Sequence, residues 1–165
     1  MKPVLLVLLT ACMIYFFSSQ TYEQQSLIPL LQLMLPGEPL KGLLSQLELT
    51  YWSRLISVEE RGYYYFLEFL IRKFAHLLLF GILAVSLTRF LETAVRLHFM
   101  KAAVIALLLT GLYAVFDEYH QLQTGGRTAL VSDVLLDITG AVIAIWLYAP
   151  VHYMLRRRRK NGPVF

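Results

Sequence analysis

Four apolar stretches constrain this chain of 165 residues more than any other feature. They run from about 3–19, 70–88, 102–118 and 130–154. A helix needs roughly 20 mostly apolar residues to cross the hydrocarbon core of a bilayer. The apolar residues are continuous instead of alternating with polar ones, which favours helices over barrel strands. The sequence therefore predicts an all-α integral membrane protein, a four-helix bundle that forms one membrane domain over residues 1–165.

The composition argues against the soluble classes of protein. Hydrophobic residues make up 58% of the chain and charged residues only 16%, whereas soluble domains carry about 25% charged residues. A soluble domain of this size would have too few charges to cover its surface, so a cytosolic enzyme and a disordered chain are both disfavoured. The single cysteine, Cys12, excludes an internal disulfide framework and a Cys-rich metal site.

The basic residues predict the orientation, because short cytoplasmic loops carry an excess of Lys and Arg. The 89–101 loop holds three basic residues against one acid, and the tail 155–165 holds five basic residues and no acid. We therefore expect a cell-membrane protein with both termini in the cytoplasm and residues 20–69 outside. We expect the tail to attract anionic lipid of the inner leaflet rather than nucleic acid.

The first apolar stretch has an alternative interpretation as a cleaved signal sequence, since Leu9–Cys12 resembles a lipoprotein cleavage box. The apolar run continues past that box through Met13–Phe17, which favours a retained helix. Cleavage would also leave three spans and place the two termini on opposite sides of the membrane.

The long outer segment, 20–69, carries an amphipathic pattern. Apolar residues recur there at helical spacing, with polar residues elsewhere around the wheel; they are Leu40, Leu43, Leu44, Leu47, Tyr51 and Leu55. This predicts a helix that lies on the outer leaflet or over the bundle. The aromatic run Tyr63–Phe66 is then expected to form an interfacial belt at the entry to the second span.

The charge-free parts of the second and third spans are too short to cross the membrane alone. Only 15 residues separate Lys73 from Arg89, and 15 separate Lys101 from Asp117. At about 1.5 Å per residue each stretch covers roughly 22 Å, against about 30 Å of hydrocarbon. The ionisable groups at the outer ends of these helices must therefore lie near or below the headgroups, where short acids need partners.

The helical register places several of these groups on common faces. Lys73 and His76 share one face of the second span, and Asp133 and Asp137 are four residues apart in the fourth. The stripe of Asp137 continues through Gly140 and Ala144, and such small residues allow a neighbouring helix to approach closely. Four acids at the outer ends face three cations, with His76 as a fourth; they are Asp117, Glu118, Asp133 and Asp137, with Arg72, Lys73 and Arg127.

Four blocks in this order resemble the VanZ-like family. They are F-F-S-S-Q at 16–20, R-K-x-x-H at 72–76, D-E-x-x-Q at 117–121, and G-R followed by D, D and G at 126–140. The chain differs from many members in having Gly125 in place of Pro and Asp137 in place of Asn. The family is named for a membrane protein associated with teicoplanin resistance, so the resemblance implies a cell-envelope context but no reaction.

Two interpretations of the outer polar cluster stay open. It forms either a site for a lipid-linked envelope intermediate or another anionic ligand, or a structural network of ion pairs. Ionisable residues inside a membrane are functional candidates by default. The catalytic candidates are Lys73, His76, Asp117 and Glu118. The binding candidates are Arg72, Gln121, Arg127, Asp133, Asp137, Ser18, Ser19 and Gln20.

Three other functions are disfavoured. An ion pathway would need polar residues to continue to the inner side, and the third span offers only Thr110 and Tyr113. No established catalytic motif is present, so an enzyme acting on a lipid-linked or phosphorylated substrate is the alternative rather than the expectation. His76, Asp117, Glu118 and Asp133 are suitable metal ligands, but they do not match a zinc signature; no metal and no cofactor is therefore expected.

Overall fold

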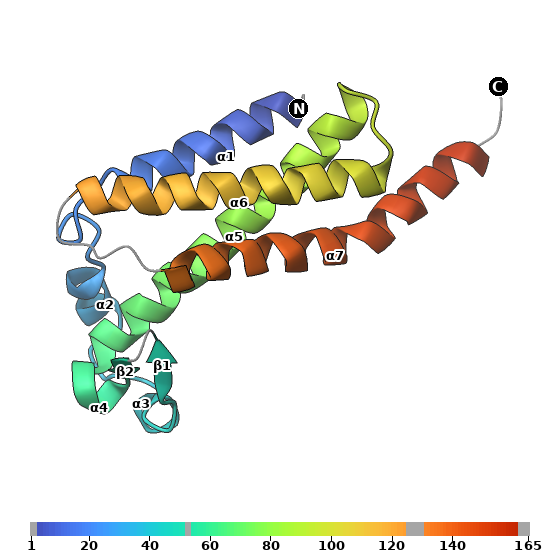
Figure 1. The fold of residues 1–165 in the computed structure, drawn as a ribbon. Coiled ribbons are helices and arrows are strands. Elements are labelled where there is room, and N and C mark those ends of the chain that lie inside the picture. Colours follow the sequence, from blue (N-terminus) through green and yellow to red (C-terminus); the bar gives the residue numbers. More distant parts are fainter. Residues whose placement is uncertain (1–2, 52–53, 125–130, 162–165) are drawn as a thin grey trace.

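The structure is a computed structural model that describes residues 3–51, 54–124 and 131–161. Helices dominate it, with one small hairpin between them (Figure 1). The elements in chain order are α1 (Pro3–Ser18), α2 (Ile28–Met34), α3 (Lys41–Leu44), β1 (Leu49–Tyr51), β2 (Arg54–Ile56), α4 (Val58–Arg61), α5 (Tyr63–Thr93), α6 (Phe99–Gln123) and α7 (Val131–Asn161). The predicted all-α class is thus confirmed in its main part.

Three helices are long and apolar enough to cross a membrane: α5, α6, and α7 as far as Arg157. The fourth apolar helix, α1, has 16 residues and is shorter than the others. Large apolar side chains point outward from these helices, for example Leu108 and Leu112 of α6 and Trp146 of α7, which is 73% exposed. Apolar surface of this extent fits contact with lipid rather than with water. The chain is therefore a membrane protein with three candidate spans.

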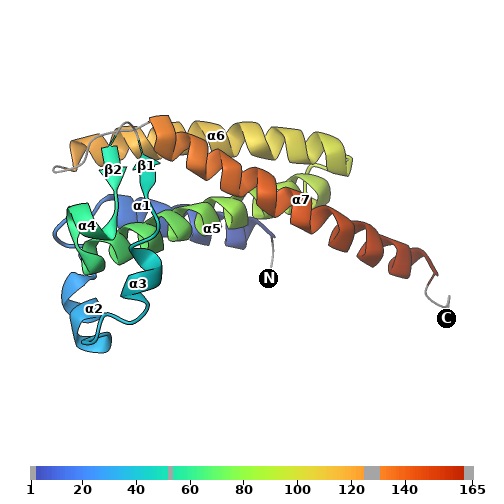
Figure 2. The ribbon, with the colours of Figure 1, turned by 90° about the horizontal axis from the view of Figure 1, so that it is seen from below.

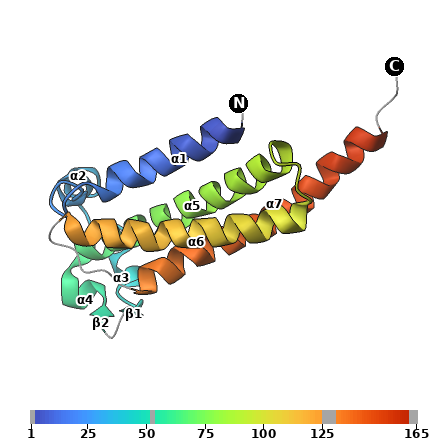
Figure 3. The same ribbon diagram turned by 45° about the horizontal axis from the view of Figure 1, so that its top comes forward.

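Helix α5 is the central element. It packs against α7 along most of its length and also against α6 and α1. Figure 3 shows α5 running between α1 and α7. The core at the middle of these helices is formed by Ile14, Phe80, Leu83 and Ala114, one or two residues from each of three helices. This packing brings the ends of α1, α5, α6 and α7 close together.

Two glycines set the close contact between α5 and α7. A Cβ atom at Gly140 would lie 2.9 Å from the Cα atom of Leu77, and one at Gly81 would lie 2.9 Å from the Cβ of Ala144. Both contacts are shorter than van der Waals distances, so neither position has room for a side chain. The predicted small-residue stripe on the fourth span is therefore confirmed, and it fixes the two helices in one register.

The prediction of an amphipathic helix over 40–55 is wrong. Helix α3 ends after one turn, and the chain then forms an antiparallel hairpin in which Leu49 pairs with Ile56 and Tyr51 with Arg54. Leu40 adopts a left-handed conformation with φ 61°, and the strand β1 contains β-branched and aromatic residues that favour extended structure. The segment therefore forms a turn and a hairpin, although its leucines recur at helical spacing.

Helix α5 begins at Tyr63, well before the predicted span at 70–88, so the aromatic run forms the first turn of this helix. Tyr63 and Phe66 are buried against Ile56 and Val58 of the preceding segment. The Tyr63 and Phe66 rings thus form a second small core with the segment before them, whereas Tyr64 and Tyr65 are only partly buried; the interfacial belt stays a prediction.

The connections alternate between the two ends of the long helices. The start of α1, the α5–α6 connection and the end of α7 lie at one end, and α2 to α4 with the hairpin lie at the other (Figures 1 and 2). The C-terminal part of α7 extends beyond its neighbours. The end that carries the hairpin is called the hairpin end below; the end of α1, the start of α5, the end of α6 and the start of α7 meet there.

Candidate functional site

An outer layer of the site is formed by Lys73 of α5 and Asp133 of α7. Their ammonium and carboxylate groups lie 2.6 Å apart, and both side chains are about four-fifths buried. Tyr51 of the hairpin donates a hydrogen bond to the same carboxylate oxygen, and its ring lies 4.6 Å from the Lys73 nitrogen. One lysine, one carboxylate and one phenol therefore join β1, α5 and α7.

The environment of Tyr51 keeps its hydroxyl protonated. Burial raises the pKa of the Tyr51 phenol above its ordinary value, and the hydrogen bond to Asp133 raises it further. A phenolate next to the Asp133 carboxylate would bring two negative charges together, whereas the neutral hydroxyl is a donor. The phenol thus acts as a hydrogen-bond donor over the whole physiological pH range.

An inner layer lies one turn further along the helices and contains His76, Asp117 and Asp137. Nδ1 of His76 lies 3.4 Å from Oδ1 of Asp137, and one ligand atom from each of the three residues lies within 4.8 Å of the others. Asp117 and Asp137 are each only 2% exposed. The His76 ring stacks on Phe80, with 6.1 Å between ring centroids. Three helices thus place one imidazole and two carboxylates around one point.

The two carboxylates of the inner layer are bound differently. Asp117 accepts hydrogen bonds from the Ser18 hydroxyl at 2.5 Å and from the Gln121 amide at 2.7 Å, so the end of α1 is tied to α6. Asp137 Oδ1 accepts no hydrogen bond from the described residues. Within the described chain, neither carboxylate is ion-paired with Lys or Arg, so the inner layer has more negative than positive groups.

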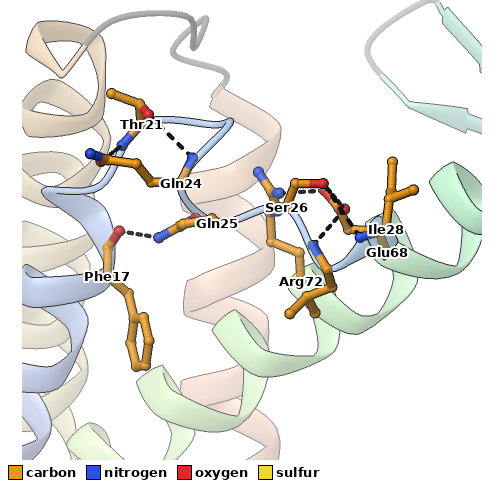
Figure 4. A network of polar contacts seen from close by, with 9 residues as sticks. Phe17, Thr21, Gln24, Gln25, Ser26, Ile28, Glu68 and Arg72 are labelled. Carbon is orange, nitrogen blue, oxygen red and sulfur yellow. Dashed lines mark hydrogen bonds and ion pairs between the residues drawn. The ribbon is translucent and has the colours of Figure 1, made fainter. Parts of the chain in front are cut away.

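Arg72 belongs to a separate network around Glu68, a residue that was not among the predicted site residues. Its guanidinium lies 2.7 Å from a carboxylate oxygen of Glu68, which is 1% exposed. The other Glu68 oxygen accepts hydrogen bonds from the Ser26 hydroxyl and the Leu27 amide (Figure 4). This network attaches the connection between α1 and α2 to α5. The i, i+4 spacing of Glu68 and Arg72 on one helix was the available signal.

The remaining predicted residues have mixed outcomes. The Ser19 hydroxyl lies 3.0 Å from Nε2 of His120, a ring of α6 that stacks on Tyr15 of α1. Glu118 is buried on α6, and Gln20 follows the end of α1, where its backbone N–H donates a hydrogen bond to the Phe17 carbonyl. Arg127 lies outside the described residues.

A second contact between a histidine and a carboxylate lies at the opposite end of the long helices. Nε2 of His152 is 3.4 Å from Oε1 of Glu92, and the imidazole stacks on Phe99 at 4.6 Å. The distance equals that between His76 and Asp137, but among the described residues only one acid lies at this histidine. The pair of Glu92 and His152 is therefore a matched comparison for the inner layer.

The charges determine what the site can do. Lys73 and Arg72 are each paired with a carboxylate, so an anionic ligand would have to displace Asp133 or Glu68 to bind either cation. The inner layer has the opposite character, because an imidazole and two buried carboxylates attract protons and cations. An imidazole held by a carboxylate can also act in proton transfer to or from a bound group.

The chain was compared with known protein families, curated proteins and solved structures. The family model described as VanZ/LLP1 matches residues 3–155, nearly the whole chain. No curated protein and no solved structure matches the chain.

Proposed function

The chain belongs to the VanZ/LLP1 family, and on that premise we propose that it acts in the cell envelope and affects susceptibility to glycopeptides such as teicoplanin. The observation that carries the proposal is the convergence of Ser18, His76, Asp117 and Asp137 at the hairpin end. Four helices contribute to this one buried point, and the two acids there have no Lys or Arg partner among the described residues.

We propose further that α1 is a fourth span and that the hairpin end faces outward. Both ends of the chain and the α5–α6 connection then lie in the cytoplasm, with the basic residues of 89–101 and 155–165 on the side where such residues accumulate. Helix α1 would be about 24 Å long, so its ends would lie close to the headgroups. The alternation of the connections between the two ends supports this arrangement.

The proposed ligand is the polar part of a lipid-linked envelope intermediate. The hairpin end carries the inner layer and the pair of Lys73 and Asp133 where the long helices meet the hairpin. In the proposed orientation this end lies at the outer leaflet, so a ligand anchored in the bilayer would reach it without leaving the membrane. An anionic group of the ligand would displace the Asp133 carboxylate from Lys73 and bind the lysine in its place.

A second candidate function is an enzyme that acts on a lipid-linked or phosphorylated substrate. The contact of His76 with Asp137 favours it, because a carboxylate can hold an imidazole in the tautomer needed for proton transfer. The paired Lys73 and Asp133 favour instead the structural interpretation, in which the cluster only fixes helix register. The ligand-binding function and the enzymatic function both require the inner layer. The structural interpretation does not require it.

The proposal is tested by teicoplanin susceptibility in cells that express the chain. His76→Gln and Asp117→Asn are compared with Glu92→Gln, which changes the matched contact at the other end. We expect the first two variants to lose most of the effect on susceptibility and Glu92→Gln to keep it, at equal abundance in the membrane. An unchanged susceptibility in both inner-layer variants contradicts the proposal.

A further inference from the structure

We propose that His76, Asp117 and Asp137 bind a divalent metal ion that accepts mixed nitrogen and oxygen ligands, of the kind of Zn²⁺ or Mn²⁺. The sequence contains no metal-binding motif for these three residues, because they lie on three different helices. The set that the structure brings together also differs from the suitable ligands seen in the sequence, since Asp137 takes part and neither Glu118 nor Asp133 belongs to it.

The geometry of the three side chains is that of a ligand set. Metal–ligand distances are roughly 2.0–2.6 Å, so two atoms bound to one ion lie at most about 5 Å apart. One atom each of His76, Asp117 and Asp137 satisfies this condition, with all three within 4.8 Å of one another. Three protein ligands leave coordination positions open for water or a substrate group.

The second observation is the unsatisfied state of Asp137. This residue is 2% exposed, yet its Oδ1 accepts no hydrogen bond from any described residue and lies in the ligand set. The His76 ring lies 3.4 Å from this oxygen without a well-formed hydrogen bond to it, and a coordinated cation would satisfy the buried carboxylate. Neighbouring cationic side chains do not satisfy it, because Lys73 is paired with Asp133 and Arg72 with Glu68.

The charge balance points to a divalent ion. Because metal ligands are deprotonated on binding, a bound imidazole and two bound carboxylates would carry two negative charges, which one divalent cation neutralises. Imidazole suits Zn²⁺ and other transition metals, whereas Mg²⁺ and Ca²⁺ prefer sites built from oxygen alone. His76 therefore favours the transition metals over the hard cations.

The residues around the ligands support the site. Asp117 accepts hydrogen bonds from Ser18 and Gln121, which orient its carboxylate as outer-shell groups do around metal sites. His76 is stacked on Phe80, so its ring plane is fixed. The His76 side chain is 23% exposed, and this is the exposed side of the ligand set.

This inference is independent of the role in susceptibility. A chain that binds the ion but leaves teicoplanin susceptibility unchanged contradicts only the proposed function. A chain that affects susceptibility without binding metal contradicts only the metal site.

The test uses the purified full chain in detergent, stripped with a chelator and titrated with Zn²⁺ or Mn²⁺. We expect one equivalent to bind, with affinity lowered at least about tenfold in His76→Gln, Asp117→Asn and Asp137→Asn. Glu92→Gln should bind as the unchanged chain does, because its histidine contact has one acid only. The titration is repeated with Mg²⁺ and Ca²⁺, which should bind more weakly.

Several results overturn the proposal. The proposal fails if the unchanged chain binds less than one equivalent of metal. It also fails if Asp137→Asn leaves the metal affinity unchanged, or if Glu92→Gln lowers that affinity as much as the inner-layer variants do. Should the inner-layer variants not fold, electron paramagnetic resonance of bound Mn²⁺ decides. A chain with His98, His120 and His152 replaced by Gln keeps His76 alone, and it must still show coupling to a histidine nitrogen.

Discussion

His76 and Asp137 face each other across the α5–α7 interface, with Nδ1 and Oδ1 3.4 Å apart. Asp117 approaches the same point from α6, so one imidazole serves two buried carboxylates. Lys73 and Asp133, which pair in the same register, lie one turn nearer the hairpin. The polar groups thus form two layers. The outer layer is balanced in charge, and the inner layer is acidic.

Replacing Gly140 by Ala is expected to destabilise the chain by about 1–3 kcal/mol, the typical cost of overpacking. The new Cβ would meet the backbone of Leu77, which cannot rotate away. Gly42→Ala is the control, since a Cβ there has nothing within 4 Å. Thermal unfolding in detergent measures both. Equal melting temperatures for the two variants would contradict the close contact of α5 with α7.

Replacing Lys73 by Met is expected to destabilise the protein by about 1–3 kcal/mol, because Asp133 then loses its cationic partner in a mostly buried place. Asp133→Asn alone should cost a similar amount, and the double variant should cost less than the sum of the two. A double-mutant cycle on the free energy of unfolding checks this. Strict additivity would show that the two groups do not interact.

Replacing Tyr51 by Phe should remove one tyrosine that titrates unusually late. The pKa of Tyr51 is raised in the folded chain, so its contribution to stability is complete below the ordinary tyrosine pKa of about 10 and is lost as the pH rises above it. Ultraviolet difference titration of the unchanged chain against Tyr51→Phe isolates this group. A difference that appears at or below pH 10 would contradict the burial of the phenol against Asp133.

Replacing Glu68 by Gln is expected to loosen the connection between α1 and α2. Arg72 would keep its charge in a mostly buried position without a carboxylate, and the hydrogen bonds of Ser26 and Leu27 would weaken. Hydrogen exchange should rise in residues 21–28 and stay unchanged in α6. Glu23→Gln, an exposed change in the same segment, is the control. Equal exchange in the two variants would contradict the network.

The membrane helices were predictable because their signal is continuous apolarity. The close approach of α5 and α7 at Gly140 was also predictable, since small residues at helical spacing commonly allow two helices to pack closely. The hairpin was not predictable from the leucine spacing, because Tyr51 is placed by a contact with Asp133, far away in the sequence. Local pattern carries no information about such a contact.

The candidate site shows the same division. Pairs within one helix, such as Glu68 and Arg72, follow from spacing alone. The pairing of Lys73 with Asp133 and of His76 with Asp137 depends on the register between two helices. The sequence shows which residues each helix carries at its end, but it does not show which of them meet. The predicted count of four acids and three cations omitted Glu68, which pairs with Arg72, and it did not reveal the acidic inner layer.

The most direct test measures stability and susceptibility together in Asp137→Asn. If the inner layer is a site, the variant removes a buried acid that has no Lys or Arg partner among the described residues, so the chelator-treated protein should be at least as stable as the unchanged chain, while its effect on teicoplanin susceptibility is lost. If the layer is only structural, the variant should be less stable, and its effect on susceptibility should fall only as far as its abundance in the membrane does. The second result would contradict the account.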